Sequence, residues 1–118
     1  AYVEREKQSP EEAIQLIIKA GGVPVLAHPA HLNNISETID ELKAAGLEGM
    51  EVFYAEYSHT MIEHLKGIAL QNDLLPCGGS DYHANDTPRE PIPGDNGPPL
   101  WVADRVMGIA LERGGVLR

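Results

Sequence analysis

The most informative stretch of the sequence is Leu74-Leu75-Pro76-Cys77-Gly78-Gly79-Ser80-Asp81-Tyr82-His83. Its first half is a short, mostly apolar strand candidate, and its last residues place a carboxylate two positions from an imidazole. Side chains two apart on an extended backbone project to the same side, so we expect Asp81 and His83 to converge at the end of the strand. Another strand candidate, Val23-Pro24-Val25-Leu26-Ala27, ends at His28. Two strands that deliver His, Asp and His to their carboxyl ends predict part of a metal site.

Strands and helices alternate along the rest of the chain. Apolar residues recur at helical spacing in four segments, and short apolar runs bounded by turn residues mark three strands. We expect helices at about residues 10–20, 35–45, 58–70 and 100–113, and strands at 23–27, 49–54 and 74–78. The first strand is continuously apolar, which is typical of a parallel strand buried on both faces, and we expect Trp101 to pack the last helix. The alternation predicts an α/β fold of parallel βαβ units.

The composition is that of one globular unit of 118 residues, with 42% apolar and 23% charged residues. No apolar run approaches the roughly 20 residues that span a membrane. The net charge of −9 disfavours a broad nucleic-acid surface. One cysteine, Cys77, excludes an internal disulfide and fits a reducing compartment, so we expect a cytoplasmic protein. Cys77 itself is better explained as a small buried residue than as a nucleophile.

One acidic residue lies inside a strand candidate. Glu51 is flanked by apolar residues in the segment Gly49-Met50-Glu51-Val52-Phe53-Tyr54. A buried carboxylate needs a partner. We therefore expect Glu51 to support a neighbouring ligand, or to accept a hydrogen bond from an N–H group, rather than to bind a metal directly.

Two segments of the chain together resemble a known family. The run Gly21-Gly22-Val23-Pro24-Val25-Leu26-Ala27-His28-Pro29, followed by Gly79-Ser80-Asp81-Tyr82-His83, resembles the C-terminal half of the PHP family, named for polymerase and histidinol phosphatase. The resemblance is to its small metal-dependent phosphoesterases. It implies a distorted β/α barrel whose strand ends hold two or three divalent ions, often manganese, iron or zinc. Such ions would generate a hydroxide nucleophile and polarise a phosphomonoester or a nucleotide phosphodiester.

The resemblance also implies roles for single residues. His28 matches the family's metal ligand in the Ala-His-Pro motif, and Asp81 and His83 match its last ligand pair. His59, followed by Thr60, lies where the family often has a His before a small hydroxyl residue. That position implies contact with the phosphate of the substrate, and the alternative is an exposed residue at a helix start.

The chain departs from the family in one respect. The family's site also uses an early His-x-His motif and further ligands from the N-terminal half of the barrel, and no His-x-His precedes His28 here. We therefore expect residues 1–118 to be a single partial domain that is inactive, or nearly so, alone. A barrel cut through its sheet exposes an unpaired edge. Self-association, or pairing with the missing N-terminal half, is the expected consequence.

A long loop is expected between the last strand and the last helix. Residues 84–99 are rich in Pro, Gly, Asp and Asn, which predicts a loop with a role of its own or a disordered one. Its arginine, Arg89, is either a bidentate phosphate contact or an ordinary exposed charge.

Besides a phosphoesterase, two functions stay open. One is a non-catalytic PHP-derived structural or interaction module, and the other is a metal-dependent amide hydrolase.

Overall fold

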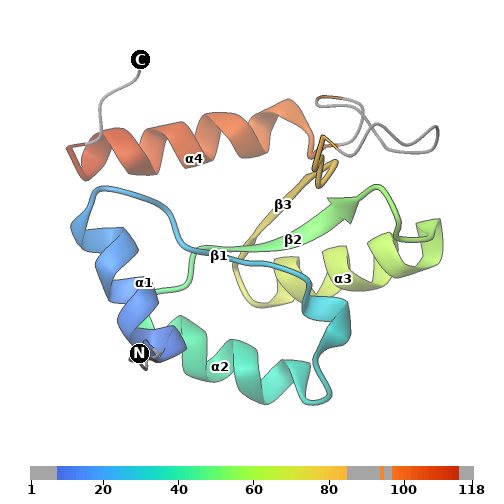
Figure 1. The fold of residues 1–118 in the computed structure, drawn as a ribbon, viewed down its shortest axis with the longest axis horizontal. Helices are drawn as coiled ribbons and strands as arrows, with labels where there is room; N and C mark the ends of the chain where they lie inside the picture. Colours follow the sequence, from blue (N-terminus) through green and yellow to red (C-terminus); the bar gives the residue numbers. More distant parts are fainter. Residues whose placement is uncertain (1–7, 85–93, 95–96, 115–118) are drawn as a thin grey trace, which may run out of the picture.

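The structure, a computed structural model, describes residues 8–84, 94 and 97–114. Its three strands form one parallel sheet in the order β1-β2-β3. This arrangement, drawn in Figure 1, confirms the α/β class. The elements in chain order are α1 (Pro10–Lys19), β1 (Val25–Leu26), the short 3-10 helix η1 (Pro29–His31), α2 (Ile35–Ala45), β2 (Gly49–Tyr54), α3 (His59–Gln71), β3 (Leu75–Gly79) and α4 (Leu100–Glu112).

The helix ends follow from local sequence signals. Ser9 begins α1, and its hydroxyl accepts a hydrogen bond from the Glu12 N–H at 3.1 Å. Ser58 does the same for α3 through Met61, also at 3.1 Å. Such caps satisfy N–H groups that have no partner within the helix. At the other end of α2, Gly46 adopts a φ of 115°, a conformation that favours glycine.

The core lies between the sheet and the helices α1, α2 and α3. Figure 1 shows α2 and α3 on one side of the sheet and α4 on the opposite side. The buried cluster consists of Ile14, Ile39, Leu42, Leu47, Met50, Val52, Leu65, Ala69 and Leu74. Met50 and Val52 are both fully buried, as expected for alternate residues on one face of β2.

Helix α4 is fixed near the amino-terminal ends of the strands. The guanidinium of Arg113 donates to the Gly22 carbonyl at 2.8 Å and forms an ion pair with Glu48, the residue just before β2. Val102 anchors the other end of α4, with only 1% of its surface exposed. The expectation that Trp101 packs this helix is wrong, because 47% of Trp101 is exposed and the neighbouring Val102 points inward instead. The contacts of Arg113 fix the carboxyl-terminal end of α4, and the helix itself runs along one side of the sheet (Figure 1).

The first strand differs from its prediction. Only Val25 and Leu26 pair with β2, rather than all of residues 23–27, and Val25 is 40% exposed. The prediction of burial on both faces is therefore wrong. In the described part of the chain β1 is the edge of the sheet, with β2 as its single neighbour. None of the described helices is both long and apolar enough to cross a membrane.

Candidate metal and phosphate site

Polar side chains from all three strands meet at the carboxyl edge of the sheet. His28 follows β1, Tyr54 ends β2, and Asp81 follows β3. His28 and Asp81 both have left-handed backbone conformations, with φ of 50° and 56°. Such conformations are uncommon for residues other than glycine, and they concentrate at functional sites, where the surrounding structure holds them in place.

Asp81 and His83 do not meet through the alternation of side chains along an extended strand, as the sequence predicted. Strand β3 ends at Gly79, and the left-handed backbone of Asp81 is not extended, so simple alternation does not apply. The two residues are nevertheless neighbours. The Nδ1 atom of His83 lies 2.6 Å from the backbone oxygen of Asp81 and 3.9 Å from its Oδ1. A tight turn therefore brings them together.

Glu51 holds the backbone and the ring of His28. Its Oε1 accepts a hydrogen bond from the His28 backbone N–H at 3.0 Å and lies 3.3 Å from the His28 Nδ1. The Glu51 side chain is only 17% exposed, whereas that of His28 is 46% exposed. This contact turns Nδ1 of the ring toward Glu51. A carboxylate beside one ring nitrogen is a common way to orient a histidine whose other nitrogen binds a metal.

Tyr54 connects the two outer strands. Its hydroxyl donates to Oδ2 of Asp81 at 3.2 Å, and its ring contacts that of His28 edge-on, with 5.6 Å between centroids. Burial, together with the negative charges of Glu56 and Asp81, raises the pKa of Tyr54 to about 12. The hydroxyl therefore keeps its proton at neutral pH and remains a hydrogen-bond donor.

A register shift in the sheet explains how Tyr54 reaches this edge. Pairing between β2 and β3 runs from Glu51↔Cys77 to Phe53↔Gly78, so that Val52 is an extra residue. Phe53 then packs against the core. Strict alternation would have placed Tyr54 on the same face as Met50 and Val52. Irregularities of this kind re-aim side chains next to active sites.

Three other residues considered from the sequence add no described contact to this group. His59 is exposed in the first turn of α3, and no contact joins it to His28 or Asp81 in the described structure. Arg89 lies outside the described residues. Burial raises the pKa of the Cys77 thiol, in keeping with a neutral, structural cysteine.

Two more aromatic residues, His31 and Tyr57, join this edge of the sheet. His31 in η1 contacts the His28 ring edge-on at 5.8 Å between centroids. Tyr57 contacts Tyr54 at 4.9 Å. The Oη atom of Tyr57 is buried, and it has no hydrogen-bond partner among the described residues.

The donor types at this edge fit a divalent metal, but they form only part of a ligand set. Imidazole nitrogen and carboxylate oxygen suit zinc, manganese and iron. No group of three or more His, Cys, Asp or Glu within residues 8–84, 94 and 97–114 is arranged to hold an ion. His28, Asp81 and His83 thus fit as contributors that need further ligands.

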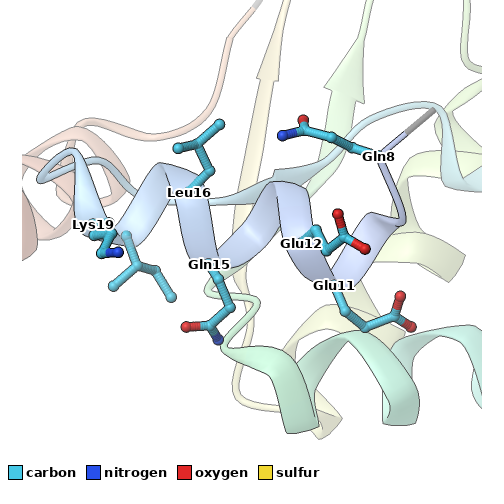
Figure 2. Close-up of a pocket in the computed structure, with 7 residues that line it drawn as sticks. Gln8, Glu11, Glu12, Gln15, Leu16 and Lys19 are labelled. Carbon is cyan, nitrogen blue, oxygen red and sulfur yellow. The ribbon is translucent and has the colours of Figure 1, made fainter. Parts of the chain in front are cut away.

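A surface hollow elsewhere is unrelated to this group. It measures about 550 Å³ and lies along α1, as Figure 2 shows. Its walls mix polar and apolar side chains of α1 and of the residue two positions before it: Gln8, Glu11, Glu12, Gln15, Leu16, Ile18 and Lys19. None of them is a predicted site residue.

A parallel α/β sheet with polar side chains at its carboxyl edge is the arrangement in which α/β proteins bind ligands. Comparisons with known proteins identify which α/β proteins the chain resembles. No family model matches the chain. Among curated proteins, the chain is 35% identical over 74 residues to a phosphoribosyl 1,2-cyclic phosphate 1,2-diphosphodiesterase of Eggerthella lenta, covering 61% of this chain and 27% of that protein. It is 37% identical over 90 residues to a 3',5'-nucleoside bisphosphate phosphatase of Chromobacterium violaceum, covering 70% and 30%. It is 32% identical over 113 residues to the 5'-3' exoribonuclease Rnm of Escherichia coli, covering 92% and 36%.

Solved structures agree with these sequence relatives. A protein of Bifidobacterium adolescentis described as a metal-dependent phosphoesterase superposes with a TM-score of 0.74 at 30% identity, covering 98% of this chain and 40% of that one. An amidohydrolase of Chromobacterium violaceum, solved with bound sulfate and no metal, gives a TM-score of 0.73 at 27% identity, covering 92% and 39%. The chain is therefore a homologue of phosphoesterases with the fold of a PHP-type domain, which confirms the resemblance. It spans about a third of the length of the curated relatives it matches.

Proposed function

We propose that this chain supplies one side of the active site of a metal-dependent phosphoesterase that hydrolyses phosphomonoesters or nucleotide phosphodiesters. His28, Asp81 and His83 are the metal ligands in this proposal, and manganese, zinc or iron is the ion. The observation that carries it is the continuous set of contacts from Glu51 through His28 and Tyr54 to Asp81. These contacts link the carboxyl ends of three parallel strands, where ligands bind in α/β folds.

The chain's own residues have separate tasks at such a site. When bound, divalent ions would polarise the phosphate ester and activate the attacking water. Glu51 holds the His28 ring from its Nδ1 side, and Tyr54 holds one oxygen of Asp81. In this proposal His59, at the amino-terminal end of α3, contacts the phosphate of the substrate, and the N–H groups of this helix start support it because they favour anions.

The proposal includes a need for residues beyond those described. The absence of a three-residue metal group among the described residues, and the match to about a third of each relative, both support it. The 118-residue chain alone is then inactive or nearly so. The edge strand β1, with Val25 40% exposed, is where the remainder of the barrel or a second copy would pair.

Hydrolysis of two aryl phosphates tests this function. The full-length protein with Mn²⁺ should hydrolyse p-nitrophenyl phosphate or its bis-ester, and His28→Ala should lower kcat/KM by more than about 100-fold, because even residues that only support a ligand cost 10–100-fold. His64→Ala, which removes an exposed imidazole from α3, is the matched control and should change little. Equal activity of the His28→Ala protein and the wild type would refute the metal role.

Amide hydrolysis is a second candidate. It is favoured by the likeness to the Chromobacterium violaceum amidohydrolase, whose TM-score of 0.73 nearly equals that of the phosphoesterase neighbour. A panel of N-acyl amino acids and dipeptides, assayed beside the aryl phosphates, separates the two. Turnover of amides alone would replace the phosphoesterase proposal.

A further inference from the structure

We propose that Tyr54 is a positioning residue that fixes the orientation of the Asp81 carboxylate at the carboxyl edge of the sheet. The inference rests on the proposed metal site and deepens it. The resemblance to the family implied no role for Tyr54, and its part in the site rests on its contacts in the structure.

The contacts of Tyr54 place it between two proposed ligands. From the end of β2 its hydroxyl reaches Oδ2 of Asp81 at 3.2 Å, and its ring meets the edge of the His28 ring. Asp81 and His28 follow different strands, β3 and β1. The side chain of Tyr54, on the central strand β2, thus contacts both His28, which follows β1, and Asp81, which follows β3.

The bond to Oδ2 determines which carboxylate oxygen faces which neighbour. With Oδ2 accepting from Tyr54, the other oxygen, Oδ1, lies on the side of the His83 ring, 3.9 Å from its Nδ1. The Asp81 side chain is 36% exposed. In the described structure the Tyr54 hydroxyl donates a hydrogen bond to its Oδ2, and this bond favours one orientation of the carboxylate.

The backbone supports this role of Tyr54. The register shift between Glu51 and Phe53 turns Tyr54 away from the core and toward the edge. Tyr54 then pairs with Gly79, two residues before Asp81, so the sheet holds the tyrosine beside the turn that carries the carboxylate. Placement on a paired strand is more rigid than placement on a loop, as positioning a metal ligand requires.

Metal affinity and a metal-free signal together test the proposal in the full-length protein. Tyr54→Phe removes the hydroxyl and keeps the ring, and Tyr57→Phe is the matched control, because its hydroxyl lies on the adjacent ring and no described contact joins it to Asp81. We expect Tyr54→Phe to weaken Mn²⁺ binding about tenfold in calorimetry, the lower end for a residue that supports a ligand. We expect less than a twofold change for Tyr57→Phe. In metal-free protein, the ¹³Cγ signal of Asp81 should move in Tyr54→Phe only.

The outcomes separate this inference from the proposed function. Weaker Mn²⁺ binding and a moved Asp81 signal in Tyr54→Phe alone support it. Normal Mn²⁺ binding with an unmoved Asp81 signal overturns it and leaves the metal site standing. If the wild type binds no Mn²⁺, the proposed function fails, and the metal-free Asp81 signal still decides whether Tyr54 orients the carboxylate. Equal effects in both tyrosine variants would also overturn it, because a shared packing defect would explain them.

Discussion

Replacing His28 by glycine and by alanine tests the left-handed backbone at the site. Both variants lose the imidazole, and both keep the backbone N–H that donates to Glu51 at 3.0 Å. They differ in whether residue 28 can adopt a φ of 50° without strain. A non-glycine residue in this conformation costs about 1–2 kcal/mol. Glycine also gives the unfolded chain more conformational entropy than alanine does, which lowers the stability of the folded protein by about 0.4–1 kcal/mol.

The balance predicts that His28→Gly is more stable than His28→Ala by about 0.5–1 kcal/mol, from the difference of these two effects. Urea unfolding of the metal-free protein measures it. A control substitution, Ala103→Gly at an exposed position of α4, should have the opposite sign and cost about 0.5–1 kcal/mol. If His28→Ala is as stable as His28→Gly, residue 28 is not left-handed in the folded protein, and the argument from strain fails.

Three further predictions concern the sheet, the last helix and pH. Gly78→Ala should destabilise the protein by about 1–3 kcal/mol in urea unfolding, because the added Cβ would clash with the backbone oxygen of Phe53. A Cβ at Gly79 would meet open space, so Gly79→Ala should change the free energy of unfolding by less than about 0.5 kcal/mol. Equal losses of stability in the two variants would contradict the close approach of β2 and β3 at Gly78. Arg113→Ala should cost about 1–2 kcal/mol by thermal unfolding, because it removes the bonds that fix α4, and an unchanged midpoint would show that α4 is held otherwise. The pKa of Tyr54 is raised to about 12 in the folded protein. The stability that its neutral form contributes should therefore be complete below pH 10 and be lost as the pH rises through 12. Absorbance at 295 nm measures the phenolate that forms. The titration step of Tyr54 is the one that disappears in the Tyr54→Phe variant. A midpoint of this step near pH 10 would contradict the raised pKa of Tyr54.

The helices and the class of fold were predictable because their signals are local. Ser9 and Ser58 cap their helices with hydroxyls that reach N–H groups three residues on, and Gly46 ends α2. Each signal lies within a few residues of the feature it sets. The strand Gly49–Tyr54 was likewise predicted with its observed bounds.

What the sequence could not predict depends on contacts between distant segments. An apolar run such as that around Val25 does not reveal whether a neighbouring strand covers it, and here Val25 lies at the sheet edge. Alternation along β2 would have buried Tyr54, and only the pairing of Phe53 with Gly78 turns it toward Asp81. The proximity of Asp81 to His83 was anticipated, but the left-handed turn that produces it was not.

The most direct test of the central claim is anomalous X-ray scattering from crystals of the full-length protein grown with Mn²⁺ at neutral pH without chelator. The account predicts a manganese peak within about 2–2.5 Å of side-chain atoms of His28, Asp81 and His83, the usual range of metal–ligand distances. A manganese ion bound elsewhere in the protein, with none of these three side chains among its ligands, would contradict it.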